Sequence, residues 1–433
     1  MEKRPQRRPF PCGCVIVICL FAFLLGAGLA LWRRPAVANS APGNPAPQAN
    51  SGGLLSSLFG PKVPKWTRTE PLTVLLLGTD KRPQEPGPSR SDTMMLAMFD
   101  PARKHVSLLS IPRDLWVNVP GYGENRINTA YFEGQAYGLA NGGPGLAALT
   151  VEYNFGVPID YWVTVDFQGF VQIINALGGI DVNVPNEIVD YEYPDSNYGT
   201  FVLTIPAGQQ HMDGERALQY ARTRHSTSDF DRARRQQQII LAVRDRVLSP
   251  QVLPKLPRLI QACSGAVSTN ADSQMVLSLA SLAPQLQDVT VDNRVIDENM
   301  APNYVTADGA QVLMPDWQAI RPMVQEMFAA RLPQGQPLAN TGLRIENATD
   351  LAGLAGMTAQ FLQSAGATIV SYGDRQGGAL QRSQLYVYAD APQAVAYLRS
   401  IYHLQDDQVQ RAEGGPPGVA LNLVLGWDAI AGE

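Results

Sequence analysis

Short apolar runs separated by turn residues recur along the chain from residue 72 onward. The first three cover 72–78, 93–99 and 105–111, and the turn-forming sequence DPARK at 100–104 separates the last two. Apolar runs of this length, bounded by Gly, Pro and Asp, are typical of buried strands. The pattern therefore predicts three successive strands with a tight turn between the second and the third.

Longer stretches with helical periodicity alternate with further short runs after residue 126. The sequence predicts helices at about 127–140, 144–154, 166–177, 214–222 and 231–248, and strands at 159–165, 180–184 and 201–205. Gly178 and Gly179 end the third helix, and Asp213 caps the fourth. This alternation predicts an α/β fold in which helices cover a mixed central sheet in an α-β-α layered arrangement.

The second half of the chain contains two further regions. Residues 253–330 have a largely helical pattern, so the first folded domain is expected to extend over 70–330. Residues 331–340 are rich in Pro and Gln and predict a linker. Beyond it, 341–433 alternates as strand, helix, two strands, helix and strand, which predicts a second small α+β domain.

The N-terminal segment has the pattern of a membrane signal anchor. A basic tail at 1–11 precedes an uncharged stretch at 12–32, and Arg33 and Arg34 follow it. Its core from Val15 to Trp32 has 18 residues. As a helix it would span roughly 27 Å, close to the hydrocarbon thickness of a bilayer. The basic tail favours a cytoplasmic N-terminus. We therefore expect a single transmembrane helix in the cell membrane, with the bulk of the chain extracellular.

A cleaved signal peptide is the alternative interpretation of this segment. Ala36-Val37-Ala38 has the small-x-small pattern of a cleavage site. The apolar run is longer than a usual signal core, however, and two arginines separate it from that site, which favours the anchor. The following segment, 33–69, is rich in Pro, Ala and Gly, and predicts an extended linker that tethers the folded part.

Composition narrows the possible classes of function. The formal net charge is −5 at pH 7, so no overall basic field indicates nucleic-acid binding. Only Cys263 lies beyond residue 34, so the exported part cannot form an internal disulfide. The histidines lack the spacing of zinc ligands, and the chain has no G-x-S-x-G elbow. The candidate chemistry therefore rests on carboxylates and arginines.

Two aspartates lie where the first two predicted strands meet their connecting loop. Asp80 follows the first strand, and Asp92 opens the second after a Pro- and Gly-rich loop that also carries Arg90. If these strands are antiparallel neighbours, the third strand delivers Arg113 and Asp114 to the same edge of the sheet. Two carboxylates placed together repel each other unless a hard divalent cation or an arginine relieves the repulsion.

A second cluster of candidate residues is basic. Arg222 and Arg224 alternate, so in extended backbone they point to the same side. Arg232, Arg235 and Gln236 share one face of the helix predicted at 231–248. Cations in the first turns of a helix oppose its dipole unless an anion lies nearby, and guanidinium groups bind phosphate oxygens as forks.

Both clusters together suit a pyrophosphate held by arginines beside a carboxylate-bound Mg²⁺. The alternative is structural: aspartates after strands commonly cap turns, and a charge-rich helix is usually a solvated face with ordinary salt bridges. Spacing and composition alone favour the structural interpretation.

Four sequence blocks resemble the signature blocks of the LytR–CpsA–Psr family. They are LLLGTD…SRSDTMML, LSIPRDLWV, RINTAY and ALQYARTRH…DRARRQQQ, and they occur in the family's order behind a single membrane anchor. The resemblance is close over 72–250 and looser as far as 330. A second unit at 341–428, which begins TGLRIENATDLAGLAGMTAQFLQSAGATI, resembles the LytR C-terminal domain.

The resemblance implies a phosphotransferase of cell-wall biogenesis. Members of this family move a glycopolymer from a polyprenyl-pyrophosphate carrier to peptidoglycan, as a phosphodiester and usually with Mg²⁺, for which Mn²⁺ can substitute. Carried over to this chain, Asp80 and Asp92 are implied as metal ligands, and Asp92, Arg113 and Asp80 as the catalytic residues. The residues implied to bind the pyrophosphate are Arg90, Arg113, Arg222, Arg224, Arg232 and Gln236. Helices 127–140, 144–154 and 166–177 are expected to form an apolar tunnel for the polyprenyl chain.

Two other functions stay open at this point. One is a non-catalytic or regulatory membrane protein that binds polyprenyl phosphates or wall glycan. The other is a polyprenyl-pyrophosphate pyrophosphatase, in which water replaces the sugar hydroxyl as acceptor.

Overall fold

The computed structural model describes most of the chain beyond residue 65. The described residues are 66, 68–81, 87–139, 142–195, 199–223, 229–252, 259, 266–272, 275, 278, 289–332, 337–402 and 404–431. The predicted tail, the membrane segment 12–32 and most of the linker 33–69 lie outside them, so the anchor and its signal-peptide alternative stay predictions. Among the described residues, no helix combines the length and the apolar character that crossing a membrane requires.

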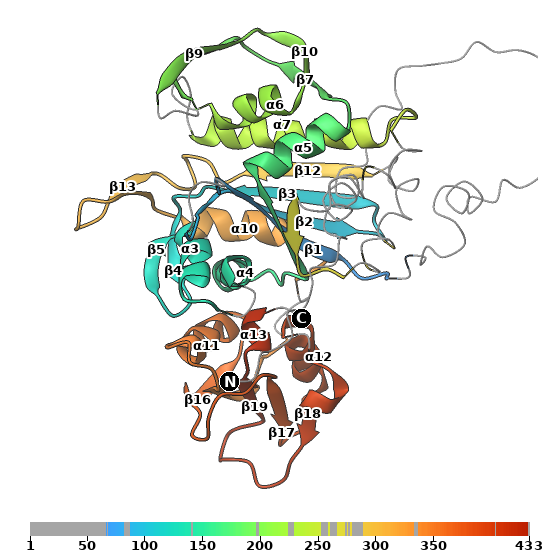
Figure 1. Cartoon of the computed structure of the whole chain (residues 1–433). Helices are drawn as coiled ribbons and strands as arrows, with labels where there is room; N and C mark the ends of the chain where they lie inside the picture. Colours follow the sequence, from blue (N-terminus) through green and yellow to red (C-terminus); the bar gives the residue numbers. More distant parts are fainter. Residues whose placement is uncertain are drawn as a thin grey trace, which may run out of the picture.

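A six-stranded mixed sheet forms the centre of the first unit (Figure 1). In spatial order its strands are β11 (Val267–Thr269), β6 (Tyr161–Asp166), β1 (Leu72–Thr79), β2 (Ser91–Asp100), β3 (His105–Ile111) and β12 (Thr290–Val295). The first three predicted strands are confirmed as β1, β2 and β3, which are antiparallel neighbours. This order brings the end of β1, the start of β2 and the end of β3 to one edge of the sheet.

Helices cover both faces of this sheet, which confirms the mixed, helix-covered α/β architecture (Figure 1). One face carries α5 (Phe167–Ala176), α6 (Gly214–Arg222) and α7 (Asp229–Val247), and the other carries α3 (Thr129–Ala136), α4 (Gly142–Phe155) and α10 (Trp317–Met327). Alternate residues of β1 enter two separate cores, Val74 and Leu76 the first, Leu75 and Leu77 the second. Strands buried on both faces have continuous apolar runs, and this is why the sequence pattern reveals them.

Four small hairpins or ribbons surround the central layers. They are β4 (Trp116–Val119) with β5 (Gly123–Arg126), β7 (Ile180–Val184) with β10 (Gly208–Met212), β8 (Ile188–Pro194) with β9 (Thr200–Ile205), and β13 (Asn303–Val305) with β14 (Gln311–Leu313). The largely helical pattern predicted for 253–330 is wrong over 289–314, which contains β12, β13 and β14. β12 is an edge strand with the polar sequence TVDNRV, so it has no apolar run to identify it.

A second sheet with its own core forms the C-terminal unit, 337–431. Its strands, in spatial order, are β16 (Thr368–Asp374), β15 (Gly342–Asn347), β19 (Leu421–Leu425), β17 (Gln384–Val387) and β18 (Val409–Arg411). Its helices are α11 (Leu354–Ser364), α12 (Pro392–Ile401), α13 (Asp428–Ala431) and the 3-10 turn η3 (Asp406–Gln408). The structure follows the predicted order of strands and helices and adds three short elements, η3, β18 and α13.

The C-terminal unit packs against α4 of the first unit (Figure 1). The Tyr153 hydroxyl donates a hydrogen bond to Gln360 Oε1 at 2.7 Å across this contact. A cavity of about 40 Å³ lies between the units and is lined by Glu152 of α4 and by Tyr402. Glu152 Oε1 accepts a hydrogen bond from the backbone N–H of Ile159 at 2.6 Å. Burial nevertheless raises the pKa of the Glu152 carboxyl group to about 8.

This raised pKa predicts that Glu152 weakens the fold as pH rises. The carboxyl group is neutral in the folded protein up to about pH 8 but ionises near its ordinary pKa of 4.5 when unfolded. The folded state therefore binds the extra proton between these values, and stability falls across that window by at most about 1.4 kcal/mol per pH unit. We expect Glu152→Gln to remove this contribution.

Denaturant titrations of the wild type and of Glu152→Gln at pH 5 and pH 8.5 measure the effect. The variant should gain stability relative to the wild type at the higher pH only. Parallel pH profiles for the two proteins would contradict a buried, neutral Glu152.

Candidate functional site

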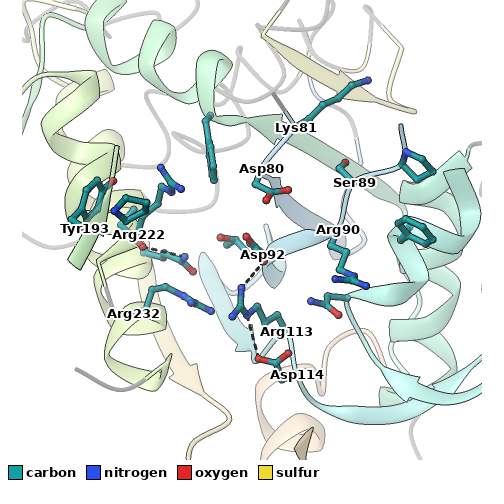
Figure 2. A pocket seen from close by; sticks show the side chains of 18 of the residues that line it. Asp80, Lys81, Ser89, Arg90, Asp92, Arg113, Asp114, Tyr193, Arg222 and Arg232 are labelled. Carbon is teal, nitrogen blue, oxygen red and sulfur yellow. Dashed lines mark hydrogen bonds and ion pairs between the residues drawn. The ribbon is translucent and has the colours of Figure 1, made fainter. Parts of the chain in front are cut away.

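A polar cavity of about 740 Å³ opens at the sheet edge where β1 and β3 end and β2 begins (Figure 2). Its lining comes from the β1–β2 connection, the start of β2, the end of β3, α3, the start of α5, β8, α6 and α7. Seven residues that the sequence singles out line this one cavity: Asp80, Arg90, Asp92, Arg113, Arg222, Arg232 and Gln236. The fold thus brings the acidic and the basic cluster together, although Asp80 and Arg222 are 142 positions apart in the sequence.

The two aspartates reach this cavity because β1 and β2 approach each other closely there. The register between the two strands shifts at Gly78 and Thr79, just before Asp80. A Cβ atom on Gly78 would lie 2.9 Å from Cβ of Thr93, so only glycine allows this approach. Asp80 follows the irregular end of the pair, and both it and Asp92 line the cavity, as Figure 2 shows.

Ion pairs hold Arg113 at the centre of the cavity (Figure 2). Its Nη1 donates to Asp92 Oδ1 at 2.7 Å, and its Nε donates to Asp114 Oδ2 at 3.2 Å. Arg126 Nε approaches Asp114 Oδ1 at 3.4 Å from the other side. Burial opposes the charge on Arg113, but the two carboxylates outweigh it, so the pKa of Arg113 is raised. Arg113 therefore remains a cation with a fixed orientation.

Aromatic rings orient two of the other arginines. The Arg222 guanidinium, at the C-terminal end of α6, lies 4.2 Å from the ring centroid of Phe167 and 5.9 Å from that of Tyr193. Arg90 lies 5.8 Å from the ring centroid of Phe132 on α3. Contacts of this kind favour a cation over a ring face and reduce its freedom to move. The cavity therefore presents arginines that are already oriented.

One described arginine of the basic cluster, Arg235, does not join the cavity wall. Arg235 lies on the helical face predicted for Arg232 and Gln236, but it is buried and donates Nε to the carbonyl oxygen of Tyr220 at 3.0 Å. A second donation goes to the carbonyl oxygen of Thr223, and burial lowers the pKa of Arg235. Arg235 thus fastens the end of α6 to α7. Arg224 lies outside the described residues.

Several lining residues were not predicted as site residues. Asp190 of β8 is 1% exposed and accepts a hydrogen bond from Thr223 Oγ1 at 2.7 Å, next to Arg222. Tyr193 of the same strand, Phe167 and Asn128 also line the cavity. No apolar run marked β8 in the sequence, so nothing there pointed to Asp190 or Tyr193. Asn128 does lie in the RINTAY block, to which no role was assigned.

An apolar cavity of about 120 Å³ adjoins the polar one. It lies between the central sheet and α5, α6 and α7, and Phe167, Arg222 and Gln236 line both cavities. The expectation that helices 127–140 and 144–154 form an apolar tunnel is wrong for this cavity. These segments correspond to α3 and α4, which cover the opposite face of the sheet, and only 166–177 contributes as predicted.

Comparison with known proteins identifies the chain. Residues 48–329 match the LytR_cpsA_psr family. The chain belongs to the LytR–CpsA–Psr family. Residues 340–428 match a second family, described as LytR cell envelope-related transcriptional attenuator. The resemblance of both regions is thereby confirmed.

Relatives of this LytR–CpsA–Psr chain include a protein named as a regulator and one named as a transferase. "Regulatory protein MsrR" of Staphylococcus aureus is 33% identical over 202 residues, which are 46% of this chain and 56% of MsrR. "Polyisoprenyl-teichoic acid--peptidoglycan teichoic acid transferase TagV" of Bacillus subtilis is 32% identical over 261 residues, 59% of this chain and 63% of TagV. The chain thus spans little more than half of the length of these relatives.

The fold of this LytR–CpsA–Psr chain also occurs in solved structures. The crystal structure of protein gbs0355 from Streptococcus agalactiae has a TM-score of 0.51 and 22% sequence identity, and the match covers 60% of this chain and 88% of that one. At this identity the likeness shows the fold alone.

Proposed function

We propose that this protein is a membrane-anchored phosphotransferase that attaches a glycopolymer from a polyprenyl-pyrophosphate carrier to peptidoglycan by a phosphodiester bond. One observation carries the proposal: a polar cavity rich in arginine and carboxylate adjoins an apolar cavity, and Phe167, Arg222 and Gln236 line both. A lipid pyrophosphate needs a polar cavity for its pyrophosphate group and an apolar cavity for its hydrocarbon chain. The relative TagV, named as a teichoic acid transferase, supports the same reaction class.

The charge of the polar cavity suits a pyrophosphate. Five cationic side chains and four carboxylates line it. Each carboxylate that pairs with an arginine also fixes that arginine in place, as Asp92 and Asp114 do for Arg113. Arginine forks so oriented bind phosphate oxygens bidentately, with little further loss of side-chain entropy.

Asp80 and Asp92 fit a bound Mg²⁺ or Mn²⁺. Both carboxylates line the same cavity, and hard divalent cations take oxygen ligands of this kind. Within the described part of the chain, no group of three or more His, Cys, Asp and Glu residues could hold a metal. Mg²⁺ usually has one or two carboxylate ligands and completes its shell with water and substrate phosphates. When bound, the ion would neutralise charge on the pyrophosphate.

The residues of the chain would then act as follows. A sugar hydroxyl of the acceptor attacks the phosphorus attached to the glycan, and the bond from that phosphorus to the bridging oxygen breaks. Polyprenyl phosphate leaves with its hydrocarbon chain in the apolar cavity. Arg113 and Arg222 stabilise the charge on the transferred and leaving phosphates. Asp92 accepts the hydroxyl proton, and Asp80 is the alternative acceptor.

The name of MsrR favours a second candidate, a regulatory protein that binds the lipid pyrophosphate without turnover. Incubating the full-length protein in detergent with a glycan on polyprenyl pyrophosphate, Mg²⁺ and peptidoglycan fragments separates the candidates. Transfer yields a glycan–phosphate–peptidoglycan product and polyprenyl phosphate, both detectable by mass spectrometry. Free glycan phosphate would indicate a pyrophosphatase. An unchanged donor that stays bound would indicate the regulatory binder.

We also propose that residues 12–32 anchor the protein in the cell membrane, with the N-terminus cytoplasmic and the two folded units extracellular. The support is the uncharged stretch behind a basic tail, together with the lipid carrier that the proposed reaction requires. Protease added to intact, wall-free cells should then remove the folded units. Protection of the folded units in intact cells would contradict this orientation.

The apolar cavity gives a prediction about the donor lipid. Leu218 of α6 lines that cavity and is only partly buried, so Leu218→Trp should fill the cavity with little damage to the core. We expect kcat/KM for a long-chain polyprenyl donor to fall about tenfold or more, because the lipid loses apolar contacts. A donor with a short, water-soluble chain should react at nearly the wild-type rate.

Leu241→Trp is the matched control. Leu241 of α7 packs against the same core and is partly buried, but it is not among the described residues that line the cavity. Equal losses with the long and the short donor, or equal losses in both variants, would show that the cavity does not hold the lipid chain.

A further inference from the structure

Asn128 occupies the N-cap position of α3 but does not cap the helix. Its side chain makes no capping hydrogen bond. The equivalent residues of α5 and α6 do cap: Asp166 accepts from the N–H of Gly169 at 2.7 Å, and Asp213 accepts from that of Arg216 at 2.8 Å. Asp166 and Asp213 have the extended backbone that a capping residue normally has, whereas the backbone of Asn128 is helical, with φ −69° and ψ −16°. The Asn128 amide therefore does not serve as the cap of α3.

The fold does not use the oxygen of this amide elsewhere either. Asn128 is 5% exposed, and its Oδ1 has no hydrogen-bond partner among the described residues. Leaving a buried acceptor unsatisfied is costly, and such groups are uncommon in folded proteins. Asn128 nevertheless lines the polar cavity. The terminal torsion of asparagine is soft, so a rotation of the amide can turn its oxygen toward a ligand there.

The backbone places this amide beside the reacting centre. The N–H of Asn128 donates to the carbonyl oxygen of Arg113 at 3.2 Å, and the Arg113 side chain pairs with Asp92 at 2.7 Å. Phe132, one turn further along α3, lines the same wall. Asn128 is not among the described residues that line the apolar cavity, whereas Arg222 and Gln236 line both. Asn128 therefore lies on the wall of α3, and the lipid side is formed by α5, α6 and α7.

The chemistry of a neutral amide selects its partner. A phosphate only accepts hydrogen bonds from the protein, and the arginines of the cavity already supply charged donors for it. Sugar hydroxyl and acetamido groups both donate and accept hydrogen bonds. They therefore match a side-chain amide, which has an NH₂ donor and an oxygen acceptor. The acceptor Oδ1, which has no partner among the described residues, calls for an O–H or N–H donor.

We propose that the side-chain amide of Asn128 is a sugar-recognition group, and that it hydrogen-bonds to a hydroxyl or amide group of the sugar next to the reacting phosphate. This inference rests on the proposed function and deepens it. The sugar can come from the donor glycan or from the peptidoglycan acceptor, because both carry the same groups. Binding and kinetic measurements distinguish these two sources.

Asn128→Ala in the full-length protein is the central test. No capping bond is lost and an unsatisfied buried acceptor is removed, so the melting temperature should stay the same or rise. We expect kcat/KM for transfer to fall about tenfold or more, as for other sites that lose a hydrogen bond to a substrate hydroxyl. A higher KM for the sugar-bearing donor would assign the contact to the donor glycan. A higher KM for peptidoglycan fragments would assign it to the acceptor.

Asp213→Ala is the matched control for the helix cap. Asp213 caps α6 with its side chain, so its removal should lower the melting temperature, in contrast to Asn128→Ala. Polyprenyl pyrophosphate without a sugar serves as the second probe. Its affinity should be equal for the wild type and Asn128→Ala, because the amide does not contact phosphate or lipid.

Three results would overturn the proposal. The first is a melting temperature of Asn128→Ala that falls as it does in Asp213→Ala. The second is a KM of Asn128→Ala that is unchanged for both substrates. The third is an affinity of Asn128→Ala for the sugarless pyrophosphate that falls as much as its affinity for the sugar-bearing one. Failure of the proposed function looks different: the wild type would then catalyse no transfer. In that case a wild type that prefers the sugar-bearing over the sugarless pyrophosphate, and an Asn128→Ala variant that loses this preference, would still support sugar recognition.

Discussion

Arg113→Ala is expected to lower kcat/KM for glycopolymer transfer about a thousandfold, the scale seen when a preoriented charge on a transferring phosphate is removed. Arg113 lies between Asp92 and Asp114, at 2.7 Å and 3.2 Å, and these contacts aim it before substrate arrives. Arg113→Lys should recover only part of the activity, because lysine keeps the charge but loses the planar fork. Steady-state transfer kinetics with donor and acceptor varied separately measure both variants.

Arg294→Gln provides a control for the loss of a paired arginine. Arg294 also pairs with two carboxylates, Asp292 at 3.0 Å and Glu326 at 2.8 Å, but it does not line the polar cavity. Its removal should leave kcat and KM within about twofold of the wild type. Wild-type activity in Arg113→Ala, or the same loss in Arg294→Gln, would contradict the assigned role. Because Arg113→Ala also removes an ion pair from both Asp92 and Asp114, its melting temperature must be recorded alongside.

Asp92→Asn is expected to lower kcat by about a hundredfold to ten-thousandfold, the contribution typical of a general base. The substitution preserves size and can still accept a hydrogen bond from Arg113, so the geometry of the cavity should survive. It removes the charge that takes the hydroxyl proton and that would hold Mg²⁺. Additional Mg²⁺ should therefore not restore kcat in Asp92→Asn. Asp80→Asn should need a higher Mg²⁺ concentration but should then recover part of its rate. Transfer rates measured across a range of Mg²⁺ concentrations test this difference.

Asp114→Asn is the matched control for Asp92→Asn. Asp114 also pairs with Arg113 and lines the cavity, but it orients the arginine and has no assigned contact with metal or acceptor. Its loss should be clearly smaller than that of Asp92→Asn and independent of Mg²⁺. If Asp92→Asn keeps the wild-type rate and the wild-type Mg²⁺ dependence, Asp92 is neither the base nor a metal ligand.

The sequence reveals most about the parts of the fold that are buried on both faces. β1, β2 and β3 are continuous apolar runs because both of their faces lie in a core, and their antiparallel order follows from the short connections between them. That order alone was enough to predict that Asp80, Asp92 and Arg113 meet at one edge. β12 was not predicted, because a polar edge strand has no continuous apolar run.

Side-chain roles within the basic cluster could not be separated from spacing. Arg232 and Arg235 both follow the helical repeat of α7, yet Arg232 lines the cavity and Arg235 is buried against the end of α6. Which of the two arginines lines the cavity depends on how the end of α6 packs against α7. Helical spacing within α7 does not reveal this tertiary contact. The apolar cavity was assigned to the wrong helices for a similar reason. The apolar residues of α3 and α4 predict buried helices, but they do not say which face of the sheet these helices cover.

By itself, the sequence determined the helix-covered mixed sheet and the meeting of two carboxylates with Arg113, because short-range order and apolar runs encode these features. The family followed from the resemblance of four sequence blocks. Only the tertiary structure decided how the site is completed. It placed Asp190 and Tyr193 from an unpredicted strand beside Arg222, joined the polar cavity to an apolar one, and placed Asn128 in the cavity wall without a capping hydrogen bond to its helix. These features depend on contacts between segments far apart in the chain, and no local pattern of residues specifies such contacts.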